Sequence, residues 1–202
     1  WNATVQSGKY IVELRDGSGC SVYDTVLIEE TIGSRYYIST TGSDTADGTL
    51  SGPLSTIQEA LGRACDGDTI VLLDGEYFEN VKISSISPMV TIASEMILDG
   101  DSSHISLTKV NGMDEDPVFD IRDKSSSSQN VVLYGFTVTN GKSNSNWWGG
   151  GGISAKSSDI ELENMIISGN RSGNSVGGIG MDYCELVIKN NIIEDNIANS
   201  SG

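Results

Sequence analysis

The chain has 202 residues, of which 37% are hydrophobic, and its formal net charge at pH 7 is −16. This acidity argues against nucleic acid as a partner, because nucleic-acid binding needs a basic surface, and no apolar run is long enough to insert into a membrane. Its 24 glycines with only 3 prolines suit a fold rich in tight turns rather than a collagen-like chain.

The segment 1–33 reads as a β-hairpin. Residues 10–14 and 20–28 alternate between apolar and polar side chains around a Gly-rich turn. The pattern G-x-Y-x-V … D-x-x-G-C … V-x-I over residues 8–28 is similar to the end of the immunoglobulin-like repeats of gliding-adhesin (SprB-type) proteins. This resemblance implies that residues 1–33 are the C-terminal part of such a repeat. An ordinary edge hairpin packed on the next domain is the alternative.

A strand at 36–39 and a polar turn at 40–49 precede a predicted amphipathic helix at 55–65. Ser55 and Gln58 have the spacing of a capping box at its start. Leu54, Ile57, Leu61 and Ala64 recur at helical spacing and predict one apolar face. A second strand at 69–73 follows the turn Asp-Gly-Asp at 66–68.

The run Y-Y-I-S-T-T-G-S-D … P-L-S-T-I-Q-E-A-L … D-G-D-T-I-V-L-L-D-G-E-Y-F-E-N-V over residues 36–81 resembles the opening of right-handed parallel β-helix proteins of the pectate-lyase-like superfamily. The resemblance implies an all-β chain in which residues 34–202 form the N-terminal cap and first coils of a β-helix. The short helix would plug the open N-terminal end, which agrees with the need of stacked repeats for a cap.

An internal repeat supports this fold. Residues 131–141, 160–170 and 186–196 align without gaps at nearly constant spacing, and Gly-Gly-Ile at 151–153 recurs at 177–179. The repeat predicts coils of three short strands, whereas a β-sandwich would not repeat its turns in register.

The aligned positions also predict the corners and the core. Gly135, Asn164 and Asn190 fall at one corner, where Gly and Asn tolerate a left-handed backbone, and the asparagines could hydrogen-bond along the stack. Core columns are expected as follows: Leu133, Leu162 and Ile188; Val138, Ile167 and Ile193; Phe119, Ile153 and Ile179.

The same alignment places Arg122, Lys156 and Asp182 in one outward row. The superfamily resemblance implies that sugar lies along the sheet of the Gly-Gly-Ile strands, where Arg122 and Lys156 could bind uronate carboxylates or act as a lyase base. Asp182 alone is no convincing acidic cluster, so the catalytic residues stay unknown. A solvated ladder of charges is the alternative.

The loop at 142–149 contains paired tryptophans in a polar setting. Trp147 and Trp148 could stack on sugar rings, with Asn144 and Asn146 supplying hydrogen bonds; otherwise one or both tryptophans fold back over the preceding coil.

No cofactor or metal site is expected. The acidic turns at 44–48 and 99–101 could hold Ca²⁺, but their spacing favours ordinary turn chemistry. The single histidine, His104, cannot build a metal site or a catalytic triad alone, and we expect it to be exposed. Cys20, Cys65 and Cys184 are expected to be buried free thiols.

Two functions remain open. The favoured one is a secreted or cell-surface β-helix module of a large adhesin or matrix protein that binds polysaccharide or a cell-surface glycan. The alternative is the N-terminal part of a polysaccharide lyase or glycoside hydrolase acting on acidic polysaccharide. We favour binding because the sequence shows no clustered acid–base set. The repeat still runs at 186–196, so we also expect further coils, or self-assembly through the open C-terminal coil.

Overall fold

A computed structural model describes residues 8–15, 17, 21–28, 34–85, 87–123, 131–144, 149–173 and 176–199. The chain divides into two compact units, Trp1–Ile32 and Gly33–Gly202. In the first unit, β1 (Gly8–Arg15) pairs antiparallel with β2 (Ser21–Ile28), which confirms the predicted hairpin. The adhesin-repeat identity of this hairpin stays a prediction.

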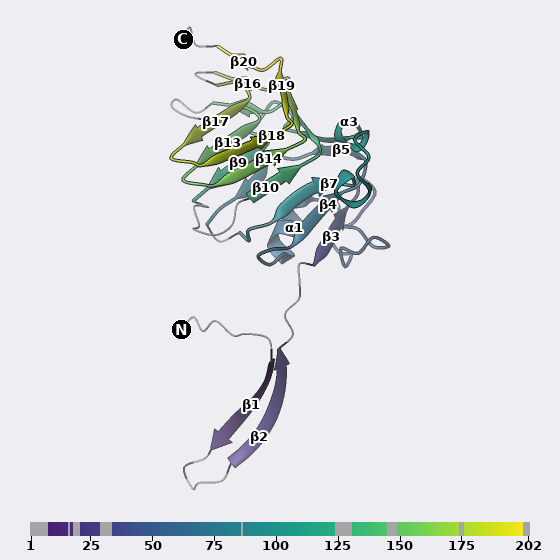
Figure 1. Ribbon diagram of the computed structural model, residues 1–202, viewed down its shortest axis with the longest axis vertical. Coiled ribbons are helices and arrows are strands. Elements are labelled where there is room, and N and C mark those ends of the chain that lie inside the picture. The colour runs from purple at the N-terminus through teal and green to yellow at the C-terminus, as the bar shows by residue number, and fades with distance from the viewer. Residues whose placement is uncertain are drawn as a thin grey trace. The chain divides into compact units, whose positions relative to one another are not determined.

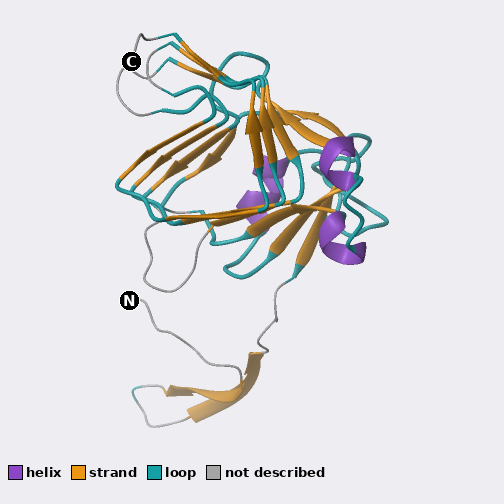
Figure 2. Ribbon diagram, turned by 45° about the horizontal axis from the view of Figure 1, so that its top comes forward, coloured by secondary structure: helices purple, strands orange, loops and turns teal. Residues whose placement is uncertain are grey.

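The second unit is a parallel β-helix (Figures 1 and 2). Its described strands form four parallel sheets, in which each strand pairs with its counterparts in the neighbouring coils. The six-stranded sheet contains β3 (Arg35–Ile38), β4 (Thr69–Leu72), β7 (Thr91–Ser94), β10 (Val131–Tyr134), β14 (Ile160–Glu163) and β18 (Leu186–Lys189). The five-stranded sheet contains β5 (Gly75–Phe78), β8 (Thr108–Asn111), β11 (Thr137–Thr139), β15 (Ile166–Ser168) and β19 (Ile192–Glu194). The four-stranded sheet contains β6 (Val81–Ile83), β9 (Phe119–Arg122), β13 (Ile153–Lys156) and β17 (Ile179–Asp182), and the three-stranded sheet contains β12 (Lys142–Ser143), β16 (Arg171–Ser172) and β20 (Ile197–Ala198).

The predicted register is confirmed. Leu133 pairs with Leu162 and Leu162 with Ile188, and the other two predicted core columns align in the same way. One prediction was incomplete, because each later coil holds a fourth strand. That strand is a single pair of residues, too short for an alternating pattern to reveal it in the sequence.

Left-handed residues turn the corners of the coil. Gly135, Asn164 and Asn190 have φ of 74°, 54° and 54°, as predicted for this corner. Two further corners use the same device, at Asn140, Gly169 and Asp195 and at Asp123, Ser157 and Tyr183. A positive φ is energetically unfavourable for most residues that carry a Cβ, and Gly, Asn and Asp adopt it most readily. This preference explains why these three residue types occupy most of the corner positions.

The asparagine ladder lies elsewhere than predicted. Asn170, not Asn164, is fully buried and bonds along the stack: its Nδ2 donates to Asn196 Oδ1 at 3.0 Å and to Val138 O at 3.1 Å, and its Oδ1 accepts from Gly141 N at 2.9 Å. A residue in the left-handed corner directs its side chain out of the coil, whereas Asn170 follows the corner and points inward. One amide thus joins three coils.

Replacing Asn170 with Ala should lower the free energy of unfolding by about 3 kcal/mol, because the buried N–H of Gly141 would lose its acceptor and the amide that joins three coils would be lost. Urea denaturation followed by circular dichroism measures this loss. The exposed Asn199→Ala is the control and should change stability by less than about 0.5 kcal/mol. Equal losses in the two variants would contradict a special role for the buried amide.

A short helix, α1 (Ile57–Arg63), buries Ile57, Ala60 and Leu61 in the core of the first coils. Its N-cap is Thr56, whose hydroxyl accepts from Glu59 N at 3.2 Å, so the predicted Ser55–Gln58 capping box is wrong. The reason is that the N–H groups of Ser55 and Thr56 are both taken by the Asp44 carboxylate at 2.9 and 3.0 Å.

Two more helices, α2 (Met96–Asp99) and α3 (His104–Leu107), lie between β7 and β8. With the turn between them they span residues 96–107, at the corner where later coils turn with one left-handed residue. Figure 1 shows α3 beside the five-stranded sheet. None of the helices in the described part of the chain is long and apolar enough to cross a membrane.

The expectation of buried thiols was wrong for Cys65, which is exposed, and Cys184 is only half-buried. Cys65 follows α1 in a turn, where its N–H donates to Asp68 Oδ2 at 2.8 Å and its side chain leaves the apolar face of the helix. Cys184 follows the left-handed corner residue Tyr183. Cys20 lies outside the described residues.

The last described coil exposes much of its apolar surface. The exposed fractions of Ile188, Ile192, Ile193 and Ile197 are 49%, 52%, 47% and 60%. Coverage of this surface by further coils or by a second copy stays a prediction.

Candidate functional site

The outer face of the four-stranded sheet carries the polar groups that the sequence singles out. Apolar residues of β6, β9 and β13 point inward and are buried, and the alternate residues point outward. Strand pairing sets these outward residues in two rows. The first row is Lys82, Asp120, Ser154 and Gly180, and the second is Arg122, Lys156 and Asp182.

Arg122 connects the two rows. Its Nε donates to Asp120 Oδ1 at 2.6 Å, and its Nη2 donates to Ser154 Oγ at 3.3 Å on the neighbouring strand. The guanidinium therefore lies across the sheet and covers Ser154, which is 3% exposed. A group held in this way is pre-oriented, so less side-chain entropy is lost when it binds a ligand.

Lys156 and Asp182 form the other end of the second row. Their charged atoms are 3.9 Å apart, and the Lys156 side chain is 52% exposed. The predicted Arg122, Lys156 and Asp182 row is therefore confirmed as an arrangement. Its role in carbohydrate binding stays a prediction.

A cleft of about 200 Å³ lies where this sheet meets the three-stranded sheet. Arg122 lines it, whereas Lys156 and Asp182 do not. The remaining lining residues are Lys82, Asp116, Pro117, Asp120, Ser143 and Ser154. Two bases, two acids and two hydroxyls thus surround a small polar space.

The predicted tryptophan loop begins beside this cleft. Ser143 lines the cleft, and the exposed Asn144 follows it directly. Asn146, Trp147 and Trp148 lie outside the described residues.

Lys82 and Asp116 belong to the site but were not predicted from the sequence. Lys82 stands in an alternating strand, but a longer stretch of chain separates it from its coil partner Asp120 than separates partners in the later coils, so it falls outside the repeat. Asp116 precedes β9 in an irregular turn and carries no periodic signal.

Comparison with known proteins gives the chain a family. A family model described as a protein of unknown function (DUF1565) matches residues 40–201, about four fifths of the sequence. The chain belongs to the DUF1565 family. The family match covers every strand of the β-helix except β3, and it includes both rows and the cleft. It begins after the hairpin unit.

Among solved structures, a protein titled rhamnogalacturonan lyase is similar, with 12% sequence identity and a TM-score of 0.35. The match covers 82% of this chain and 60% of that lyase, so this chain spans less than two thirds of its length. The search of curated proteins gave no match.

The site is suited to binding hydroxyl-rich ligands. Its bases donate hydrogen bonds, its carboxylates accept them, and its serine hydroxyls do both. The outward rows hold three bases and two acids, a local excess of positive charge on a chain whose net charge is −16.

Proposed function

We propose that this chain is an extracellular or cell-surface β-helix module of a large adhesin or matrix protein, and that it binds polysaccharide on the outer face of the four-stranded sheet. The observation that carries the proposal is the cleft, in which Arg122 is held by Asp120 and reaches the neighbouring strand. A flat sheet face offers a regularly spaced row of polar groups, which suits an extended polymer better than a compact metabolite.

An acidic polysaccharide is the preferred class of ligand. Lys82, Arg122 and Lys156 are spread over three adjacent strands, and neighbouring strands lie about 4.8 Å apart. A chain of uronate units crossing the strands would meet one base on each. The paired acids Asp120 and Asp182 would accept hydrogen bonds from sugar hydroxyls.

Lyase activity is the second candidate, favoured by the presence of Lys82 and Arg122 beside Asp116 and Asp120 in one cleft. β-Elimination needs a base that can take a proton, whereas Nε and Nη2 of the Arg122 guanidinium already donate to Asp120 and Ser154. Within the described residues, the cleft also lacks three clustered acids that could hold Ca²⁺. We therefore rank binding above catalysis.

Replacing Arg122 with Ala should weaken binding to polygalacturonate about tenfold or more, because a charge-assisted hydrogen bond contributes about 1.5–3 kcal/mol. Affinity electrophoresis or calorimetry with polygalacturonate, and with neutral galactan for comparison, measures the effect. Lys109→Ala is the matched control, since Lys109 is an exposed base on β8 of another sheet.

Equal binding by the wild type, Arg122→Ala and Lys109→Ala would exclude the cleft as the site. The absorbance of the conjugated double bond made by β-elimination, followed in the same mixtures, distinguishes a lyase from a binding module. Steady formation of that product, lost in Arg122→Ala, would favour the second candidate.

A further inference from the structure

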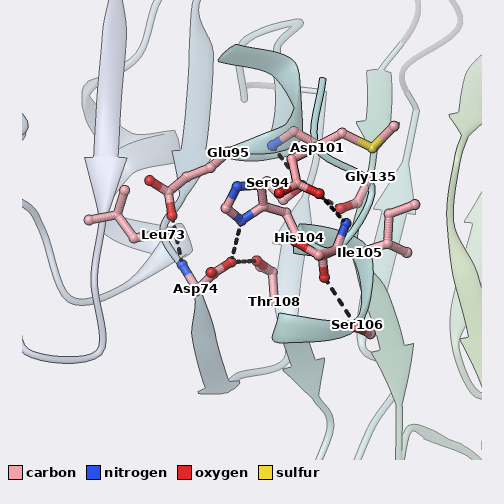
Figure 3. Close-up of polar contacts among 12 residues, drawn as sticks. Leu73, Asp74, Ser94, Glu95, Asp101, His104, Ile105, Ser106, Thr108 and Gly135 are labelled. Carbon is pink, nitrogen blue, oxygen red and sulfur yellow. Dashed lines mark hydrogen bonds and ion pairs between the residues drawn. The ribbon is translucent and has the colours of Figure 1, made fainter. Parts of the chain in front are cut away.

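A second polar cluster lies on the opposite side of the coil from the candidate carbohydrate face, at the corner between the six-stranded and five-stranded sheets. It is built by the α2–α3 insertion and by the turn between β4 and β5 (Figure 3). The prediction that His104 is exposed was wrong, because its side chain is only 14% exposed and contacts two carboxylates.

The two ring nitrogens of His104 have different partners. Nδ1 lies 2.7 Å from Asp74 Oδ1, and Nε2 lies 3.2 Å from Asp99 Oδ2. Asp74 is held in place from two sides, since its N–H donates to Glu95 Oε2 at 3.1 Å and its Oδ1 accepts from Thr108 Oγ1 at 3.2 Å. Figure 3 shows Asp74, Glu95 and His104 facing one another.

The ligand atoms of Asp74, Glu95 and His104 all lie within 4.8 Å of one another, although they come from three separate segments. Oxygen and nitrogen ligands about 2.1 Å from Zn²⁺ are about 3.4 Å apart at tetrahedral angles. Small side-chain movements would therefore bring the three groups to coordination distance. Three carboxylates around one imidazole also leave an excess of negative charge for a cation to neutralise.

His104 also has the second hydrogen-bond partner that is typical of a metal-binding histidine. Such a histidine usually binds the ion through one ring nitrogen and donates from the other to a carboxylate, which fixes the ring. Asp99 stands at Nε2 in that position. An imidazole nitrogen beside carboxylate oxygens suits Zn²⁺ and similar transition ions, whereas Ca²⁺ prefers oxygen ligands alone.

We propose that Asp74, Glu95 and His104 bind a divalent transition-type cation, with Zn²⁺ as the representative ion and Asp99 as the residue that orients the imidazole. The ion would tie the α2–α3 insertion to the turn after β4. The three side chains leave a coordination position for water. This site is independent of the proposed carbohydrate face, so each proposal can fail without the other.

The test is calorimetric titration of the metal-free full chain with Zn²⁺, after alkylation of the cysteines so that thiols cannot bind it. One equivalent should bind. His104→Gln should weaken binding at least about tenfold, and Asp99→Asn about tenfold, the usual range for a group that orients a ligand. Asp123→Asn is the control and should bind as the wild type does, because Asp123 is an exposed carboxylate at a left-handed corner, where Asn fits equally well.

Glu95→Gln provides a second variant if His104→Gln does not fold, since the amide oxygen can still accept from Asp74 N while the charged ligand is lost. It should also weaken Zn²⁺ binding. Co²⁺ provides an independent readout, because its visible absorption bands report nitrogen and oxygen ligands and should disappear in either variant. Absence of saturable Zn²⁺ binding, or binding unchanged in the folded variants, would overturn the proposal and leave His104 as a proton-bearing partner of its carboxylates.

Discussion

Replacing Leu61 with Asp should destabilise the β-helix unit by at least about 3 kcal/mol, enough to prevent folding in a marginally stable protein. Leu61 is 3% exposed and belongs to the apolar core together with Ile57 and Ala60 of α1. The substitution removes a buried side chain and places an unpaired charge in its position. Urea denaturation followed by circular dichroism measures the loss.

Gly62→Asp is the matched control in the same helix. Gly62 is exposed, and a side chain added there meets no atom within 4 Å. The same new charge, at the adjacent position, should change stability by less than about 1 kcal/mol. If Leu61→Asp had the same denaturation midpoint as the wild type, the packing of α1 against the core of the first coils would not contribute to stability.

The later coils could be predicted because their strands repeat at nearly constant spacing. That spacing aligned β10, β14 and β18, and the structure pairs Leu133 with Leu162 and Leu162 with Ile188 as expected. The spacing is regular because each coil adds one strand to every sheet. Coils of the same cross-section therefore need nearly the same number of residues to complete one turn. The corner at Asn164 was predictable because asparagine tolerates a positive φ, and the residue has one in the structure.

The earlier coils could not be aligned in this way. In the six-stranded sheet, Arg35 pairs with Thr69, Thr69 with Thr91, and Thr91 with Val132, so the length of chain in each coil varies widely. These differences arise because α1 is inserted in one coil and α2 with α3 in another. Insertions of variable length erase the periodic signal, although the pairing of each strand remains regular.

Both polar clusters depend on contacts that no local pattern reveals. His104 is the single histidine of the sequence, and its partner Asp74 stands in a turn on a distant segment. Lys82 joins the cleft only because β6 pairs with β9 across an irregular coil. In contrast, Arg122 was found from the repeat because it stands one coil before Lys156 in the regular part of the sheet. Site residues were thus predictable where the spacing was constant.

Replacing Gly151 with Ala should cost more than about 3 kcal/mol, because the Gly-Gly-Ile strands begin where backbones of adjacent coils touch. A Cβ at Gly151 would overlap the carbonyl oxygen of Arg171 and lie 2.7 Å from the nitrogen of the same residue. Both obstacles are backbone atoms that pair with neighbouring coils, so neither can move without breaking the stack. Thermal denaturation by calorimetry measures the loss.

Gly173→Ala separates this steric effect from the general cost of replacing glycine. Gly173 is exposed, its backbone is not left-handed, and the nearest atom to an added Cβ is Ser143 O at 3.8 Å. Alanine should therefore be tolerated there, and stability should stay constant or rise by up to about 1 kcal/mol as the unfolded chain loses freedom. Equal denaturation temperatures for Gly151→Ala and Gly173→Ala would contradict the close backbone contact between coils at Gly151. The recurrence of Gly-Gly-Ile would then need another explanation.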